Sequence, residues 1–362
     1  MPALAFFAGV ASLLLAVGPF ADPSTSFSET HMSSRCEWRI DTYRVHGELD
    51  GITAFNRRNI WAVGVTNDDR PLALHWLGAG WSAVRMPVKN GPFYVTAAAF
   101  VTGNDGWAVG KGVPNDAIEH WDGQAWTVVP GADLGSRRVE LIDVAALGRD
   151  QAWAVGLSGD GVTGKALVER WNGTRWEVVP TPNVGQSGLI AVAAISRNNV
   201  WAVGGTPRKL LIEHWNGRRW RLVTTPAPRA TPRAIAALSA RDIWAVGDDG
   251  SVTHRKTLVE HWDGMRWRVV SSPVLRGTLN SIAAVSSRDI WVSGERATGR
   301  GTILAHRLGG TWRIVRPPRI KGQFNLLVAA AARNDIWAVV KTQSQSDPTG
   351  ERDVLGHYTC RP

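Results

Sequence analysis

The chain has 362 residues, of which 20% are charged, and a formal net charge of +10 at pH 7. Its length ordinarily predicts two or three domains, and its basic excess favours anionic partners such as nucleic acid, acidic glycans or charged envelope polymers. No segment beyond residue 21 approaches membrane-spanning length, so we expect no stable membrane insertion of the mature chain.

The N-terminal region resembles a secretory signal. Leu4 to Val17 is an uncharged apolar run, and small residues follow at Gly18 and Ala21. No Lys or Arg precedes this run, which is atypical of a signal peptide. We expect a signal peptide over residues 1–21, a polar disordered segment over residues 22–35, and secretion of the remainder to the extracellular space.

A pentapeptide close to Ile60-Trp61-Ala62-Val63-Gly64 recurs through the rest of the chain. The lead tryptophans of its seven copies are 46, 46, 48, 43, 47 and 46 residues apart. They are Trp61, Trp107, Trp153, Trp201, Trp244, Trp291 and Trp337. A fixed period in this range is the signature of a repeat architecture, and it overrides the length-based expectation in favour of one domain over residues 36–362.

Each period contains four short runs typical of β-strands. Leu279 to Val285 is a small-residue run that precedes the tryptophan run, and the preceding period shows the other two at Thr257 to Trp262 and Trp267 to Val270. The last two are joined by Asp263-Gly264, and such a turn between β-branched and aromatic runs indicates a hairpin. Four antiparallel strands per period are typical of a propeller blade.

The last period lacks a fourth strand. Its three runs are Leu326 to Ala332, Ile336 to Val340 and Val354 to Tyr358. The N-terminal run Cys36 to Ile40 supplies the missing strand, because its tryptophan, Trp38, matches the fourth-strand tryptophans. The sequence therefore predicts an all-β, seven-bladed β-propeller whose ring is closed by the N-terminal strand in the last blade, without an exposed sheet edge.

The chain has two cysteines, Cys36 and Cys360. Aligned on the repeat, Cys360 falls where Gly264 stands and Cys36 falls where Met265 stands, which are adjacent positions in the tight turn of another blade. This proximity predicts a disulfide that replaces the missing turn and locks the ring. Two free buried thiols are the alternative, which a secretory context disfavours.

The repeat also accounts for the tryptophans and histidines. Of the 19 tryptophans, seven lie on second strands, five on third strands and seven on fourth strands. We expect Ala-rich first strands to line the channel, and Trp and Val of the second strand to fill the space between blades. One histidine per blade recurs on the third strand, with Arg170 as the exception: His75, His120, His214, His261, His306 and His357. Because a blade separates each from the next, they cannot form one metal site, so we expect hydrogen bonds within the blades and neither metal nor cofactor.

From Cys36 to Pro362 the chain resembles secreted bacterial seven-bladed β-propellers of the broad kelch, Asp-box and galactose-oxidase-like group. The matching features are the Trp-Ala-Val-Gly strand and the D-G-x-x-W hairpin. The kelch double glycine appears only at Gly204-Gly205, and the Asp-box serine and the WD40 glycine–histidine signature are missing. Galactose oxidase requires a copper site built from two Tyr, two His and a Cys–Tyr crosslink. Here both cysteines are expected to pair with each other and the chain has three tyrosines, so the resemblance does not favour that enzyme activity. No G-x-S-x-G, HExxH, Walker or EF-hand motif is present.

Basic residues gather in the loops that join the fourth strand of one blade to the first strand of the next. In propellers these loops and the second-to-third-strand loops share the face around the channel mouth. The first set carries nine basic residues against Asp133 alone: Lys89, Arg137, Arg138, Arg229, Arg233, Arg276, Arg316, Arg319 and Lys321. A ring of cations around a concave mouth focuses anions, whereas scattered solvated arginines are the alternative interpretation.

The leading hypothesis is a secreted, monomeric, non-catalytic binding protein. It would hold an anionic glycan, a cell-envelope polymer or a protein on the Arg-rich face, without specific nucleic-acid binding. A purely structural or docking ring is not separable from it by sequence. The alternative is a sialidase-like glycoside hydrolase, with Tyr94 as nucleophile, Glu140 as its base and Arg138, Arg233 and Arg276 as a carboxylate clamp. That alternative requires these five side chains to converge.

Overall fold

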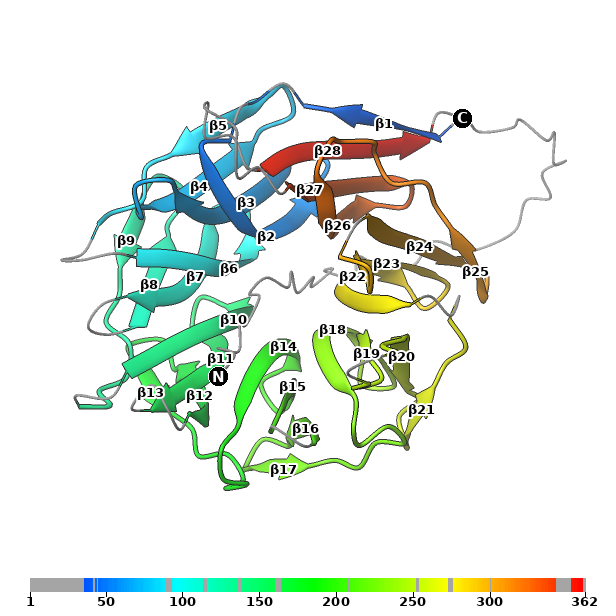
Figure 1. Ribbon diagram of the computed structural model, residues 1–362. Coiled ribbons are helices and arrows are strands. Elements are labelled where there is room, and N and C mark those ends of the chain that lie inside the picture. The colour runs from blue at the N-terminus through cyan, green and yellow to red at the C-terminus, as the bar shows by residue number, and fades with distance from the viewer. Residues whose placement is uncertain are drawn as a thin grey trace, which may run out of the picture.

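The computed structural model describes residues 36–41, 43, 45–88, 93–112, 116–135, 138–159, 164–206, 209–251, 254–272, 276–299, 301–342 and 353–360. These residues form seven four-stranded antiparallel sheets arranged in a ring, as Figure 1 shows. The all-β, seven-bladed prediction is confirmed. The predicted signal peptide and lead-in fall outside these ranges, within which no helix is long and apolar enough to cross a membrane.

The blades follow one another along the chain, each running from the channel outwards. Blades 1 to 3 contain β2 (Gly47–Asn56), β3 (Asn59–Thr66), β4 (Pro71–Trp76), β5 (Trp81–Val84); β6 (Phe93–Thr102), β7 (Asp105–Gly112), β8 (Asp116–Trp121), β9 (Trp126–Val128); and β10 (Arg138–Gly148), β11 (Gln151–Gly159), β12 (Lys165–Trp171), β13 (Trp176–Val178). Blades 4 to 6 contain β14 (Gly188–Ser196), β15 (Asn199–Gly205), β16 (Leu210–Trp215), β17 (Trp220–Leu222); β18 (Thr231–Ser239), β19 (Asp242–Asp248), β20 (Thr257–Trp262), β21 (Trp267–Val269); and β22 (Gly277–Ser286), β23 (Asp289–Arg296), β24 (Thr302–Leu308), β25 (Thr311–Ile314).

Blade 7 combines the two ends of the chain. It contains β26 (Gln323–Ala332), β27 (Asp335–Thr342), β28 (Asp353–Cys360) and, as its outer strand, β1 (Cys36–Ile40). Strand β1 pairs antiparallel with β28, with Trp38 opposite Tyr358 and Cys36 opposite Cys360. The two cysteines form a disulfide, with Cα atoms 3.9 Å apart. Both the closing strand and the disulfide are therefore confirmed, and the contact between β2 and β26 completes the ring.

The two faces of the ring carry different connections. The mouth face carries the fourth-to-first-strand and second-to-third-strand loops, as expected; Gly250 from one set lies against the Arg229 carbonyl from the other. The opposite face, here termed the turn face, carries the first-to-second and third-to-fourth turns. There Gly264, at φ 94°, lies against Arg241 of the neighbouring turn. The Asp263 carboxylate fixes this turn because its Oδ1 accepts the N–H groups of Met265 and Arg266, each at 2.9 Å.

The glycine of the Trp-Ala-Val-Gly strand is required by a bulge in the neighbouring strand. In blade 5 the register of β18 on β19 shifts between Pro232 and Ala234, leaving Arg233 unpaired in the ladder. A Cβ at Gly247 would then stand 2.0 Å from the Thr231 carbonyl oxygen, and the equivalent glycines of blades 1 to 6 are equally close to their partners. In blade 7, Val340 replaces the glycine and the shift moves to between Gln323 and Asn325.

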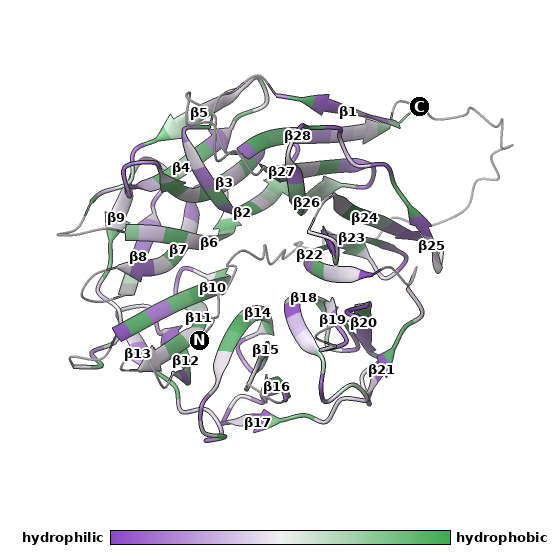
Figure 2. Cartoon of the chain, viewed as in Figure 1, coloured by the Kyte–Doolittle hydropathy of each residue, from purple (hydrophilic) through white to green (hydrophobic). Residues whose placement is uncertain are grey.

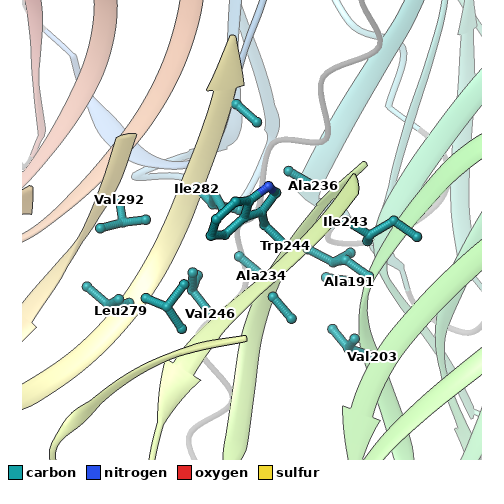
Figure 3. Packing of buried hydrophobic residues seen from close by; sticks show 14 of the residues in the cluster. Ala191, Val203, Ala234, Ala236, Ile243, Trp244, Val246, Leu279, Ile282 and Val292 are labelled. Atoms are coloured by element: carbon teal, nitrogen blue, oxygen red, sulfur yellow. The ribbon is translucent and has the colours of Figure 1, made fainter. Parts of the chain in front are cut away.

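Second-strand side chains form the core, as predicted. Figure 3 shows Trp244 among Ala236, Ile243, Ile282 and other apolar side chains of blades 5 and 6. Figure 2 shows green, hydrophobic segments along the inner strands and purple segments on outer strands such as β25. Every second-strand tryptophan is at most 2% exposed. Burying this much aromatic surface between blades stabilises the ring strongly, because a single large side chain contributes about 1.5–3 kcal/mol.

The repeated histidines make the hydrogen bonds expected of them within the blades. Each stacks near the second-strand tryptophan, with ring centroids 3.8–4.6 Å apart. Each Nε2 also lies 2.8–2.9 Å from the Oδ1 of an Asn or Asp at the first position of the second strand. Blade 3 departs from this pattern, with Arg170 and Gln151 at the two positions. No group of His, Cys, Asp and Glu in the described ranges could hold a metal ion.

Candidate functional site

Basic side chains on the mouth face are concentrated over blades 5, 6 and 7. We term this set the basic arc, and all of its members are exposed or half-buried. It consists of Arg229, Arg255, Lys256, Arg276, Arg296, Arg316, Arg319 and Lys321. Within the described part of the chain, Arg255 alone among them is ion-paired, with Nε 3.9 Å from Asp248 Oδ2. The arc therefore presents mostly uncompensated positive charge to solvent.

Backbone hydrogen bonds join the loops that carry the arc. The N–H of Gly277 donates to the Arg255 carbonyl, and the N–H of Ala297 donates to the Arg276 carbonyl, both at 3.0 Å. Arg276 also forms an antiparallel bridge with Lys256. These bonds run from the second-to-third loop of blade 5 through the loop before blade 6 to the second-to-third loop of blade 6. The loops that carry consecutive members of the arc are thus linked to one another by backbone hydrogen bonds.

The loop before blade 7 is also linked to blade 6. Gln323 Nε2 donates to Thr302 Oγ1 in blade 6 at 3.2 Å, and its Oε1 accepts the N–H of Ile320. The Arg316 carbonyl accepts the indole N–H of Trp38 at 3.0 Å, so the closing strand also fixes this loop. Arg319 and Lys321 lie exposed between these anchor points.

Arg233 lies in strand β18, whereas the sequence predicts a loop at this position. It is the bulge residue of β18, mostly buried, and its Nε has no hydrogen-bond partner. Burial lowers the pKa of its guanidinium, while Asp248 and Glu295 act in the opposite direction. Thr278 Oγ1 donates to Asp248 Oδ2 at 3.1 Å, which joins the base of this cluster to blade 6. Arg233 thus places a cation beneath the arc.

The remaining predicted binding residues lie elsewhere or outside the description. Arg137 and Lys89 fall outside the described residues. Arg138 is the exposed first residue of β10 in blade 3, at a distance of two blades from Arg233. The structure therefore brings Arg229, Arg233, Arg276, Arg319 and Lys321 to one half of the mouth face and leaves Arg138 on the other.

The residues of the predicted hydrolase site form a different arrangement. Lys111 Nζ lies 5.3 Å from the centroid of the Tyr94 ring and 3.7 Å from Glu140 Oε1, so the partner of Glu140 here is the lysine. A hydrogen bond with Asp69 raises the pKa of the Tyr94 hydroxyl, which opposes its use as a nucleophile. Arg233 and Arg276 lie in blades 5 and 6 rather than beside this cluster.

Buried acidic residues on the third strands are a further set of titratable groups. Glu119, Glu169, Glu213 and Glu260 are at most 2% exposed. Burial raises the pKa of Glu119 to about 8 and that of Glu213 to about 7, and neither carboxylate has a hydrogen-bond partner. One per blade, they do not converge, and we assign them no role in binding.

A cavity of about 240 Å³ opens on the turn face between blades 3 and 4. Its lining includes Gln151, Arg170 and Trp171 of blade 3 and Arg197 and Trp215 of blade 4. One feature of the sequence points to this place, because Arg170 interrupts the histidine series. Nothing in the sequence pattern singled out Arg197, which lines the cavity from blade 4.

No family model matches the chain, and no curated protein matches it. Its fold is similar to solved propellers. A YCF48 structure bound to D1 peptide is 15% identical, with 90% of this chain and 95% of that one covered and a TM-score of 0.59. YCF48 from Cyanidioschyzon merolae is 16% identical, covering 89% and 98%, with a TM-score of 0.58. The WD40 repeats of RRP9 are 12% identical, covering 90% and 97%, with a TM-score of 0.63. At these identities the likeness concerns the fold alone.

Proposed function

We propose that the protein is a secreted, non-catalytic binding propeller that holds an anionic glycan, a cell-envelope polymer or an acidic protein surface on its mouth face. The observation that carries this proposal is the basic arc over blades 5 to 7. Its loops are joined by backbone hydrogen bonds, so the backbone that carries these charges is held in place before a ligand arrives. Cations gathered on one face raise the local concentration of anions and speed their association.

The chemistry of the arc favours a polyanion over a small ligand. Its members are solvent-exposed and spread over three blades, so they suit a chain with repeated negative charges. Arginine guanidiniums match carboxylate, sulfate and phosphate groups through paired N–H donors. The YCF48 structure named above was solved with a bound peptide, so a propeller of this fold also accommodates a protein ligand.

The test is binding of heparin, a sulfated polysaccharide, to the mature chain and to the triple variant Arg229→Gln, Arg276→Gln, Arg319→Gln. Exposed charge pairs contribute about 0.2–1 kcal/mol each, so we expect about tenfold weaker binding by the variant. Affinity of the parent should also fall as salt rises, because screening acts over about 8–10 Å at physiological ionic strength. Titration calorimetry at two salt concentrations measures both effects.

The matched control is the triple variant Arg218→Gln, Arg219→Gln, Arg266→Gln. These arginines are also exposed but lie in third-to-fourth turns on the turn face, so the change in net charge is the same. We expect the control to bind within about twofold of the parent, since each distant exposed charge is screened. Equal losses from the two triple variants would show that only net charge matters and would refute a site on the mouth face.

A further inference from the structure

In blades 2, 6 and 7 an aspartate at the first position of the second strand is held between two basic side chains. One is the third-strand histidine of the same blade, and the other is an arginine in the first-to-second turn of the next blade. His120 Nε2 lies 2.8 Å from Asp105 Oδ1, and Arg149 Nε lies 3.8 Å from Asp105 Oδ2. The same arrangement joins His306, Asp289 and Arg333, and His357, Asp335 and Arg57. The turn face thus contains a repeated carboxylate-holding arrangement.

Blade 3 keeps the two basic partners but lacks the carboxylate. Gln151 stands at the aspartate position, Arg170 at the histidine position, and Arg197 in the turn of blade 4 corresponds to Arg149. No hydrogen bond joins Gln151 to Arg170 in the described part of the chain, and Arg170 Nε is buried without a partner. Its Nη2 lies 3.8 Å from Glu177 Oε2, too far for a hydrogen bond. Arg170 thus has only this long ion pair, and Arg197 has only an exposed ion pair with Asp150, so both guanidiniums retain donors for a further anion.

The cavity on the turn face lies at this position. Gln151, Arg170 and Arg197 all line it, together with Asp150, two asparagines and two tryptophans. Arg197 donates through Nη2 to Asp150 Oδ2, which holds its guanidinium at the cavity. Both side chains of that pair are more than half exposed, so the pair contributes little stability and a ligand anion can replace Asp150 as the partner of Arg197.

We propose that this cavity binds a carboxylate carried on a small hydroxylated molecule, of the size of one sugar acid. The ligand carboxylate would take the place that Asp105, Asp289 and Asp335 occupy in their blades, between Arg170 and Arg197. Guanidiniums hold carboxylates through paired, charge-assisted hydrogen bonds. The amides of Gln151, Asn172 and Asn198 offer donors and acceptors of the kind that hydroxyl groups use.

The size of the cavity supports a small ligand. At about 240 Å³ it is smaller than the roughly 300–1,000 Å³ typical of drug-sized ligands. The site lies on the face opposite the basic arc and shares no residue with it, so it does not depend on the proposed function of the mouth face.

The first experiment compares three probes by saturation-transfer NMR with the full mature chain. D-Glucuronate carries the carboxylate on a sugar ring, D-glucose lacks the carboxylate, and acetate lacks the ring. We expect D-glucuronate to bind at millimolar concentration, and both D-glucose and acetate to bind about tenfold more weakly or not at all. Equal binding of glucose would refute recognition of the carboxylate, equal binding of acetate would refute the hydroxylated carrier, and no binding by any probe would refute the site.

The second experiment uses the substitution Gln151→Asp with Gln151→Asn as its isosteric control. Aspartate restores the carboxylate found in blades 2, 6 and 7, so it should pair with Arg170 and Arg197 from within the chain. We expect Gln151→Asp to raise the melting temperature and to weaken D-glucuronate binding about tenfold, because the site is then already occupied. Gln151→Asn adds no charge and should keep binding within about threefold. Equal effects of the two substitutions on binding would overturn the proposal, and circular dichroism checks that both variants fold.

Discussion

Blade 7 and blade 3 both depart from the repeat, and the two departures have different consequences. Blade 7 has Val340 where the other blades have glycine, and it receives its fourth strand from the other end of the chain. Blade 3 has Gln151 and Arg170 where the others have a paired Asn or Asp and His. The first set of changes is compensated within the blade, whereas the second leaves polar atoms unpaired beside a cavity.

The compensation in blade 7 is extensive. The bulge of its inner strand lies two residues earlier than in the other blades, so that Val340 fits, and the Cys36–Cys360 disulfide joins the two ends. At the boundary with blade 1, Lys341 Nζ donates to Asp50 Oδ1 at 2.8 Å and to the Leu49 carbonyl at 3.2 Å. Burial lowers the pKa of Lys341, but the neighbouring aspartates outweigh this and raise it, so the lysine stays charged. The departures of blade 7 from the repeat therefore contribute to closing the ring.

The departure in blade 3 is compensated less fully, because Arg170 keeps only a 3.8 Å ion pair with Glu177. Arg170 stays beside the Trp153 ring, at 5.7 Å, but its Nε is buried without a partner. A buried donor without an acceptor costs about 1–3 kcal/mol. Local rules are broken without compensation mainly at functional sites, which is why blade 3, rather than blade 7, carries our proposed ligand site.

The largest expected effect is on the closure of blade 7. We expect Cys36→Ser with Cys360→Ser to lower the free energy of unfolding by up to about 5 kcal/mol, because the closed loop spans most of the chain. Urea denaturation followed by fluorescence measures the loss. Met265→Ser changes the aligned position in blade 5, where the side chain is 87% exposed, and should leave the midpoint unchanged. An unchanged midpoint in the double variant would show that the disulfide does not hold the ring.

A smaller effect tests the role of the displaced bulge. In blade 5, Gly247→Ala would place a Cβ 2.0 Å from the Thr231 carbonyl oxygen, so we expect a loss of about 3 kcal/mol in unfolding free energy. Gly80→Ala, where nothing lies within 4 Å of the added Cβ, should change it by less than about 0.5 kcal/mol. If Gly247→Ala were equally neutral, the bulge would not explain why only blade 7 accepts a larger residue.

A pH-dependent effect separates an unpaired buried group from a binding site. Glu119 in blade 2 is unpaired like Arg170 Nε, yet it is fully buried in a blade that keeps the Asp–His pair. Burial raises its pKa to about 8, so the folded state holds a proton that the unfolded state loses from about pH 4.5 upwards. Its stabilising contribution is present below about pH 4.5 and is lost as pH rises through about 8.

Glu119→Gln removes this titration. We expect the variant to be more stable than the parent by up to about 5 kcal/mol at pH 8.5, with the difference vanishing near pH 4.5, because each pKa unit corresponds to about 1.4 kcal/mol. Thermal unfolding at the two pH values measures the difference. A difference that does not change with pH would show that Glu119 is ionised in the folded chain.

The repeat predicts most of the architecture. Blade number, strand order, the strand borrowed from the N-terminus and the cysteine pair all follow from a period of seven tryptophans and from turn residues such as Asp263-Gly264. The β1 bounds, Cys36–Ile40, agree with the predicted run. These features are predictable because strand alternation and turn chemistry are local, and because a ring of equal blades leaves the order of its parts no freedom.

The candidate sites were only partly predictable. The sequence identified the basic loops, but it did not separate Arg138 from the arc or show that Arg233 is a buried bulge residue. It identified Arg170 as an exception in the histidine series, but it did not predict the cavity beside this residue.

The ring, its closure and the core positions of its tryptophans follow from the repeat in the sequence. Which side chains meet across blade boundaries emerges only in the folded chain: Arg149 with Asp105, Lys341 with Asp50, and Arg170 with Arg197 at one cavity. These contacts join residues of different blades, through side chains whose reach depends on the strand register and the angle between sheets. The local pattern does not encode either quantity.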